Sequence, residues 1–425
     1  MEPQVRDFPD HEKQAKPLPD GSTTEDGDLT REPTPRVTLE RIPTYLQPPI
    51  SVRERLRHFT FAWYTVTMST GGIALTLSLT PHRFRGLDTI GLVVFLFDLL
   101  CFILITACLL LRFLLYKHTF SKTLTHPKEA LFVSTFFLSI AALLSNAEKY
   151  GSLFLSATAQ DGLAVFHRVT YWLYLAVTFL VSVIQYHLLF TVKEQRRLQA
   201  HAMTPAWILP IFPVMLAGTI AAFDSRTQTP SQALAMITSG VAAQGLGFMV
   251  SIFMYATYLS RLMVYGLPAQ RPGMFIAVGP PSFTCAALVS MADDVPRIFA
   301  AQVPVIEGMV SPSVLADGVR LASLYCSLFL WGLSFWFFTS ALMAVVAGMP
   351  DRKFHLSWWS FVFPNAGFTI STIRVAGAVG SEGLLWFSTV MTIVLVVVWL
   401  FIAWRCAYAV VQREIVWPGH DEDSD

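Results

Sequence analysis

Ten long apolar segments constrain the fold of this chain of 425 residues. A helix that crosses the hydrocarbon core of a bilayer needs about 20 consecutive, largely apolar residues. Ten segments meet this requirement: 59–80, 88–115, 130–148, 165–192, 206–223, 232–262, 273–292, 319–348, 356–378 and 384–411. Only 14% of the residues are charged, whereas soluble domains carry roughly a quarter. The sequence therefore predicts an all-α integral membrane protein with ten transmembrane helices.

The charged segments predict how the chain is oriented in the membrane. An even number of spans places both termini on one side, and lysine and arginine are more frequent in the connections on that side. The positive-inside rule then places both termini in the cytoplasm. Residues 1–50 are rich in proline and acidic residues, which predicts a disordered cytoplasmic tail. We expect residues 51–415 to form the membrane domain and residues 416–425 a short acidic cytoplasmic tail.

Short and long spans alternate along the chain. The odd-numbered spans are short and several carry helix-breaking residues, such as Gly71-Gly72, Pro213, Pro280-Pro281 and Pro364, while most even-numbered spans are longer and contain no proline. A broken helix is tolerated at membrane depth only where its backbone faces protein or water. The pattern therefore predicts five helical hairpins, with the odd helices lining a central pore and the even helices forming an outer ring.

Small polar residues form a stripe on two of the odd spans. In the first span the stripe consists of Thr60, Trp63, Thr67, Thr70, Ala74 and Ser78, and in the third span of Thr135, Ser139, Ala142 and Asn146. Such spacings of three and four place the residues on one helix face. Two interpretations remain open. The stripes either allow close helix packing or line a narrow pore with hydroxyl donors.

The ninth span, within SWWSFVFPNAGFTISTIR, places an aromatic residue and a charge on one face. Phe363 and Arg374 are eleven residues apart, a separation that returns to within about 20° and spans roughly 16 Å of helix. Asn365 points to a different face. Arg374 either attracts an anion, extends to the outer interface or pairs with Glu382. Phe363 either packs in the protein or closes a narrow path.

The remaining polar residues leave further alternatives, and enzyme motifs are absent. Arg83 lies at the predicted outer mouth, where it either steers anions or caps the end of a span. Asp98 is a rare intramembrane acid that either pairs with an arginine or carries a proton. The chain has no nucleotide-binding, metalloprotease or hydrolase motif. We therefore expect no enzymatic activity, no cofactor, no metal and, at a net charge of +1, no nucleic-acid partner.

Three segments carry a resemblance to a known family. RHFTFAWYTVTMSTGGIAL, TPHRFRGLDTIG and WWSFVFPNAGFT resemble the tellurite-resistance/dicarboxylate transporter family, and most of all its fungal malate permease branch. The resemblance covers residues 51 to 415. It implies five helical hairpins around a pore, a homotrimer with one pore in each subunit, and closure of the pore by a phenylalanine of the ninth helix. That phenylalanine corresponds to Phe363, or to Phe361 if the alignment shifts by two residues.

The resemblance also implies a substrate class. It implies transport of malate and related C4-dicarboxylates, such as succinate and fumarate, across the plasma membrane, with sulfite or another small anion as the alternative. With Phe363 as the gate, the residues expected to line the pore or bind the anion are Arg374, Arg83, Thr67, Thr70, Gly71, Asn146, Pro213, Pro281 and Asn365.

Overall fold

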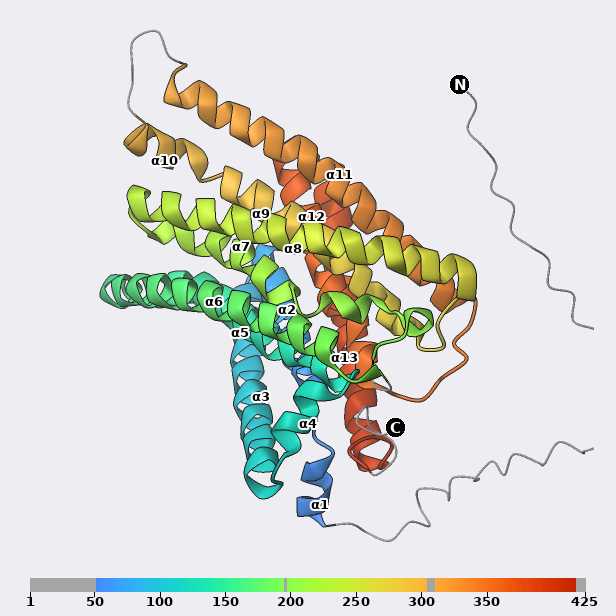
Figure 1. The fold of residues 1–425 in the computed structure, drawn as a ribbon. Coiled ribbons are helices and arrows are strands. Elements are labelled where there is room, and N and C mark those ends of the chain that lie inside the picture. The colour runs from blue at the N-terminus through green and yellow to red at the C-terminus, as the bar shows by residue number, and fades with distance from the viewer. Residues whose placement is uncertain (1–50, 195–196, 304–309, 418–425) are drawn as a thin grey trace, which may run out of the picture. The chain divides into compact units, whose positions relative to one another are not determined.

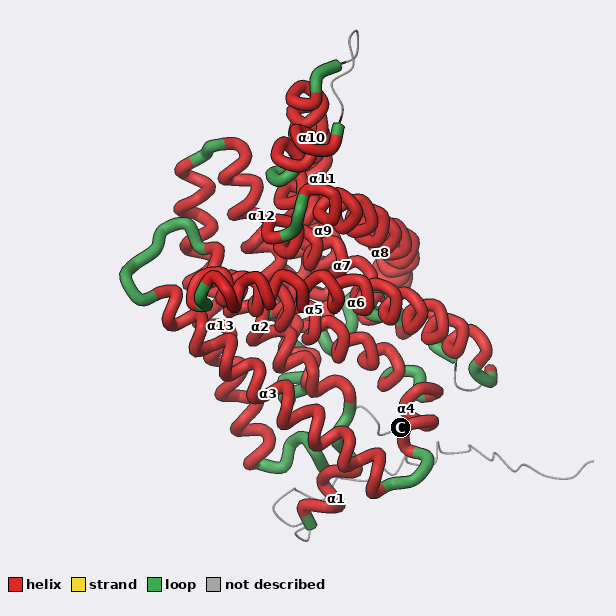
Figure 2. Tube along the Cα trace, turned by 90° about the vertical axis from the view of Figure 1, so that its left-hand side faces the viewer, coloured by secondary structure: helices red, strands yellow, loops and turns green. Residues whose placement is uncertain are grey.

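The computed structural model describes residues 51–194, 197–303 and 310–417. Within these ranges the chain consists of helices and loops and has no strand, as Figure 2 shows. The tails predicted for residues 1–50 and 418–425 lie outside the described residues. Val416 and Trp417, at the start of the predicted acidic tail, are described and are buried in the protein.

Five short helices are largely buried. They are α2 (Tyr64–Leu79), α5 (Glu129–Phe154), α7 (Phe212–Asp224), α9 (Gly279–Ala292) and α12 (Phe363–Val379). A 3-10 segment precedes four of them: η2 (Phe61–Trp63), η5 (Pro205–Ile208), η7 (Arg271–Val278) and η8 (Leu356–Phe361). A proline stands in the first turn of α7, α9 and α12. Proline fits there because a first-turn residue has no intrahelical partner for its N–H.

Five long helices expose apolar side chains. They are α3 (Leu87–Leu115), α6 (Ala157–Thr191), α8 (Pro230–Tyr265), α11 (Pro312–Val346) and α13 (Glu382–Val411). Between 17% and 39% of their most apolar segments is buried, against 67% in α5 and 94% across η7 and α9. Exposed apolar side chains of this extent suit contact with lipid. Five shorter elements complete the described chain. α1 (Val52–Arg57) precedes the longer helices, and α4 (Thr119–Thr125), η4 (Ala200–Ala202), η6 (Ser225–Thr227) and α10 (Val295–Gln302) lie between them along the sequence.

The short helices contact one another in a closed ring. α2 contacts α5, α5 contacts α7, α7 contacts α9, α9 contacts α12, and α12 returns to α2 (Figure 1). Each long helix packs against two neighbours in this ring: α3 against α2 and α5, α6 against α5 and α7, α8 against α7 and α9, α11 against α9 and α12, and α13 against α12 and α2. The centre of the ring is therefore the part of the described chain most remote from the apolar outer surface.

Within the described ranges, seven helical segments are long and apolar enough to cross a membrane: α3, α5, α6, α8, η7 with α9, α11 and α13. The protein is thus a helical membrane protein that crosses the bilayer several times. The α-helices of the other three predicted spans, α2, α7 and α12, have 16, 13 and 17 residues. The arrangement as ten spans in five hairpins goes beyond this count and belongs to the proposal below.

Tyrosines of the long helices bond to the backbone of the broken short helices. A chain that changes from 3-10 to α-helical geometry leaves some carbonyls without helical partners, and such groups are costly away from water. Three hydroxyls donate to carbonyls at these junctions: Tyr174 to Pro213 (3.1 Å), Tyr186 to Trp207 (3.0 Å) and Tyr255 to Ala277 (2.8 Å). The long helices therefore stabilise the irregular backbone that lies inside them.

Candidate functional site

Two small cavities lie along the axis of the ring. The N-side cavity, near the first turns of the short helices, is lined by Thr65, Met68, Phe132, Leu209, Phe212, Ile276, Ser360, Phe363 and Pro364. The C-side cavity, further along the same helices, is lined by Leu75, Thr219, Ala222, Phe223, Phe283, Ala286, Ala287, Ser290 and Ile370. Each has a volume of about 10 Å³, which is enough for roughly one water molecule. In this conformation neither cavity admits a dicarboxylate.

Three phenylalanine rings lie between the two cavities. Phe363, only 3% exposed, stacks on Phe283 at a centroid distance of 5.0 Å and lies 6.0 Å from Phe212. Phe363 and Phe212 line the N-side cavity, and Phe283 lines the C-side cavity. Phe361 instead packs against Phe275 at 5.2 Å. We call Phe212, Phe283 and Phe363 the aromatic layer.

Each ring of the aromatic layer lies beside a glycine of a neighbouring helix. A Cβ atom on Gly367 would lie 2.6 Å from the Phe283 ring, and one on Gly279 would lie 2.8 Å from the Phe212 ring. A Cβ atom on Gly72 would lie 3.6 Å from the Phe363 ring. The first two separations are shorter than van der Waals contact, so the rings take these positions because the glycines have no side chain. The sequence shows the glycines but not which rings face them.

Thr219 offers a free hydroxyl at the C-side cavity. Its Oγ1 atom is buried and has no hydrogen-bond partner among the described residues. A buried hydroxyl without a partner is costly, and an anion in the cavity would supply an acceptor. The spacing of small polar residues does not point to Thr219, because no stripe of such residues runs along the fifth span.

Basic side chains gather beyond the C-side cavity. The guanidinium of Arg374 lies 6.0 Å from the ring centre of Phe223, which lines that cavity, and its Nε atom has no hydrogen-bond partner within the described chain. Arg226 lies 3.7 Å from Asp293. Lys149 is close enough to Arg374, Arg226 and Arg83 for their charges to interact. Sequence reasoning had not assigned Lys149 or Arg226 to this group, which comes from the ends of different helices.

Arg83 and Glu382 have local partners. Arg83 donates to the carbonyl of Ser78 at 2.8 Å near the end of α2 and forms an ion pair with Asp88. These are the contacts of a side chain that caps a helix end. The described ion pair of Glu382 is with His82, at 3.0 Å, and not with Arg374.

The polar stripe of α2 lies at helix contacts. The hydroxyl of Thr67 is 2.6 Å from that of Ser139 on α5, and Thr70 accepts a hydrogen bond of 3.2 Å from the indole N–H of Trp399 on α13. Neither threonine is among the described residues that line the two cavities. The face of α2 toward the cavities carries Thr65, Met68 and Leu75 instead.

Other expected pore residues also have neighbours in the protein. The Asn146 side chain donates to the Gly71 carbonyl at 2.8 Å, and Asn365 donates to Phe361 at 2.9 Å. The Pro213 carbonyl accepts from Tyr174, and Pro281 is buried in the first turn of α9. The structure thus brings Phe363 to the N-side cavity and Arg374 beside Phe223 at the C-side cavity.

Asp98 is a fully buried acid. Its exposed fraction is 0%, and neither carboxylate oxygen has a hydrogen-bond partner in the described part of the chain. One of these oxygens would lie 2.7 Å from a Cβ atom placed on Gly71. An arginine partner, one of the two expectations for Asp98, is not found among the described ion pairs.

Comparisons with known proteins cover most of the chain. A family model described as voltage-dependent anion channel (SLAC1) matches residues 58–407. A malic acid transport protein of Schizosaccharomyces pombe is 33% identical over 386 residues, covering 89% of this chain and 84% of the relative. A putative malic acid transport protein of the same yeast is 34% identical, covering 89% and 86%. The sulfite efflux pump SSU1 of Trichophyton rubrum is 23% identical, covering 85% and 93%.

Proposed function

The chain belongs to the SLAC1 voltage-dependent anion channel family, and we propose that it carries malate and related C4-dicarboxylates across the plasma membrane. The observation that carries this proposal is the identity of 33% and 34% to two yeast proteins named for malic acid transport, over most of each chain. The basic side chains at the C-side cavity support an anionic substrate. Transport of this kind involves no catalysed reaction and no cofactor.

The proposed pathway runs through the ring of short helices. In this proposal ten spans form five hairpins, the short helices line the path and the long helices face lipid. The closed ring of contacts and the exposed apolar side chains of the long helices support it. Arg55 donates to the Val410 carbonyl at 3.1 Å, which joins α1 to the last helix. This contact supports a single side for both ends of the membrane domain, which we assign to the cytoplasm. A homotrimer rests on the family resemblance alone.

The aromatic layer is the proposed gate. In this proposal the stacked rings of Phe363 and Phe283 separate two cavities that are too small for the substrate, so transport requires the Phe363 ring to move and the cavities to join. Phe363 begins α12 at a change from 3-10 to α-helical geometry, where the backbone is the least regular part of the helix. A rotation of this side chain would open the path without breaking the ring of helices.

The basic residues provide the proposed attraction for the anion. Arg374 and Lys149 create a positive potential at the outer end of the path, which raises the local concentration of anions, while the charge of Arg226 is partly balanced by Asp293. The free hydroxyl of Thr219 is the proposed first hydrogen-bond donor inside the C-side cavity. The other residues expected to line the pore hold the helices around the path in this proposal. They are Thr67, Thr70, Gly71, Asn146, Pro213, Pro281 and Asn365.

Sulfite is the second candidate substrate, because relatives at 22% to 23% identity are named sulfite efflux pumps. Flux of labelled malate and of sulfite into proteoliposomes, measured at two pH values, separates the candidates. We expect malate flux above that of protein-free liposomes, reduced by unlabelled succinate and little affected by sulfite. Sulfite flux without malate flux would contradict the proposal and favour the alternative.

A further inference from the structure

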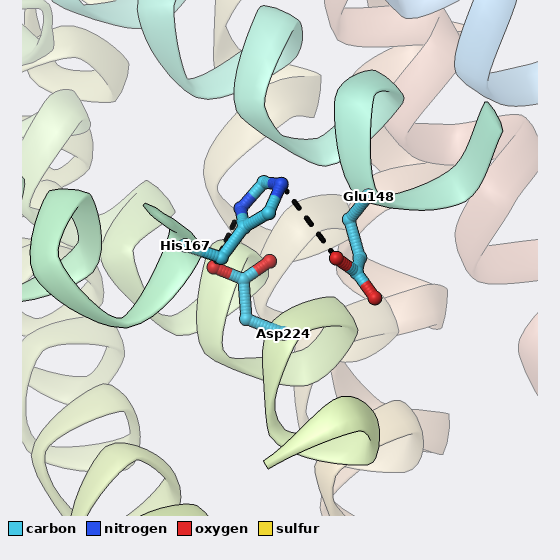
Figure 3. Close-up of side chains that lie close together, drawn as sticks. All are labelled: Glu148, His167 and Asp224. Atoms are coloured by element: carbon cyan, nitrogen blue, oxygen red, sulfur yellow. Dashed lines mark hydrogen bonds and ion pairs between the residues drawn. The ribbon is translucent and has the colours of Figure 1, made fainter. Parts of the chain in front are cut away.

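Three buried side chains from three helices point toward one another near the C-side cavity. Figure 3 shows Glu148 of α5, His167 of α6 and Asp224 of α7. His167 and Asp224 are 0% exposed and Glu148 is 5% exposed. Each offers one potential ligand atom, and these atoms all lie within 4.8 Å of one another. The proposed transport of anions does not use this cluster.

The two nitrogens of His167 have different surroundings. Nδ1 lies 3.2 Å from Oδ2 of Asp224, and Nε2 lies 3.6 Å from Oε2 of Glu148. Within the described chain Nε2 has no hydrogen-bond partner, and neither has Oδ1 of Asp224. The distance of 3.6 Å is too long for a hydrogen bond. It is close to the roughly 3.4 Å that separates two ligands of a tetrahedral zinc ion.

This arrangement matches that of a metal-binding histidine. Such a histidine presents one nitrogen to the metal and donates the N–H of the other to a carboxylate, which fixes the ring orientation. Here Nδ1 faces Asp224, so Nε2 remains available beside Glu148. The His167 imidazole and the Glu148 carboxylate are already buried and oriented, so binding of a metal ion would require only small movements of these side chains.

The charges of the cluster also call for a cation. The described ion pairs of Glu148 and of Asp224 are both with His167. With both carboxylates ionised, the cluster carries two negative charges beside a neutral imidazole and one beside a protonated imidazole. Buried charge without compensation is costly, and a divalent ion would balance both carboxylates. One imidazole with two carboxylates suits Zn²⁺ or Co²⁺, whereas Mg²⁺ and Ca²⁺ prefer oxygen ligands throughout.

We propose that Glu148, His167 and Asp224 bind a divalent transition-metal ion of the Zn²⁺ class, with Asp224 accepting from Nδ1 of His167 through Oδ2 and offering its free Oδ1 atom to the ion. The ion joins α5, α6 and α7. Asp224 directly follows Phe223, which lines the C-side cavity and lies beside Arg374, and Glu148 directly precedes Lys149. The bound ion therefore fixes the backbone that carries the basic end of the path.

The test is metal-dependent stability of the purified, full-length protein in detergent, after removal of any affinity tag and treatment with a chelator. Its thermal unfolding is followed during titration with ZnCl₂. We expect a saturable rise in the melting temperature that MgCl₂ does not reproduce. In His167→Gln the apparent affinity for Zn²⁺ falls by at least about tenfold. The matched control is His187→Gln, an exposed histidine on the same helix, which keeps the full shift.

Two outcomes overturn the proposal. One is the absence of a saturable shift with Zn²⁺ in the wild-type protein. The other is an equal shift in wild type and His167→Gln. If His167→Gln does not fold, absorption of Co²⁺ decides the question in the wild-type protein and in Glu148→Gln. We expect visible bands of bound Co²⁺ that Zn²⁺ displaces and that Glu148→Gln weakens, and their absence from the wild type refutes the site.

Discussion

Phe363 stacks on Phe283 across the ring of short helices, with ring centroids 5.0 Å apart and ring planes inclined by 28°. Phe363 lines the N-side cavity and Phe283 the C-side cavity, so in the proposed pathway this pair forms the barrier between the two cavities. Phe363→Ala removes one ring and joins the two cavities. We expect basal malate flux in proteoliposomes to rise several-fold. The loss of packing also lowers the free energy of unfolding by about 3–5 kcal/mol.

The matched control is Phe361→Ala, two residues earlier in the chain. Phe361 packs against Phe275 and lines neither cavity among the described residues. Its removal costs a similar amount of packing but leaves the aromatic layer intact, so the basal flux should not rise. Equal flux in the two variants at equal reconstitution would contradict Phe363 as the gate.

Arg374 is predicted to attract the substrate to the C-side cavity. Arg374→Ala removes a positive charge that is not paired with Glu382, and we expect the apparent KM for malate to rise more than the maximum rate falls. Arg374→Lys keeps the charge but not the planar guanidinium, so it should retain most of the affinity. The measurement is malate uptake as a function of concentration at low and high ionic strength, since salt screens this attraction.

Arg320→Ala is the control for Arg374. Arg320 lies on α11, is exposed, and has a long contact of 4.0 Å with Asp317. Its loss should leave the KM for malate unchanged. If Arg374→Ala also leaves KM unchanged and only lowers the melting temperature, Arg374 anchors its helix and does not bind the anion.

Sequence patterns predicted the alternation of buried and exposed helices for a physical reason. Proline placement and span length report where backbone is irregular, and irregular backbone must lie inside the protein. Helix geometry placed Phe363 and Arg374 on one face, because residues eleven positions apart return to nearly the same side of an α-helix. The structure places Phe363 at the N-side cavity and Arg374 beside Phe223, which lines the C-side cavity.

The sequence alone could not predict which residues of different helices contact one another. Small polar residues give the same stripe whether they face a neighbouring helix or a path, so Thr67 and Thr70 did not reveal their contacts with Ser139 and Trp399. Thr219 has no stripe around it, yet it lines the C-side cavity. The neighbours of a residue inside a ring of helices depend on the rotation of each helix, which its own sequence does not determine.

Thr219 and Thr67 are therefore predicted to respond differently to replacement by valine. Thr219→Val removes the free hydroxyl at the C-side cavity, so the apparent KM for malate should rise about tenfold, the size of a hydrogen bond to a charged group. Thr67→Val removes a hydroxyl that contacts Ser139. It should lower the free energy of unfolding by about 1 kcal/mol and leave KM unchanged. A rise in KM for Thr67→Val alone would restore the first stripe as the binding surface.

Gly71 is predicted to be essential for the packing of α2 against α3 and α5. The Cβ atom of Gly71→Ala would lie 2.7 Å from a carboxylate oxygen of Asp98 and 2.8 Å from Cβ of Ala142. Both separations are too short, so the helices must shift, and we expect a loss of about 1–3 kcal/mol in the free energy of unfolding. Gly245→Ala is the control, since a Cβ atom there meets no described atom within 4 Å. Equal stability of the two variants would contradict the close approach of these helices.

Tyr255 is predicted to stabilise the start of α9 from outside the ring. Its hydroxyl donates to the Ala277 carbonyl at 2.8 Å, where the chain changes from 3-10 to α-helical geometry, and both residues are buried. Tyr255→Phe keeps the ring but leaves that carbonyl without its donor, which costs about 1–3 kcal/mol. We expect unfolding in mixed micelles to show this loss, while Tyr265→Phe, an exposed tyrosine at the end of the same helix, shows none.

Because the Ala277 carbonyl lies beside Ile276 of the N-side cavity, Tyr255→Phe should also raise basal flux slightly. A stable variant with unchanged flux would mean that water replaces the hydroxyl, and that the outer helices do not hold the irregular backbone in place.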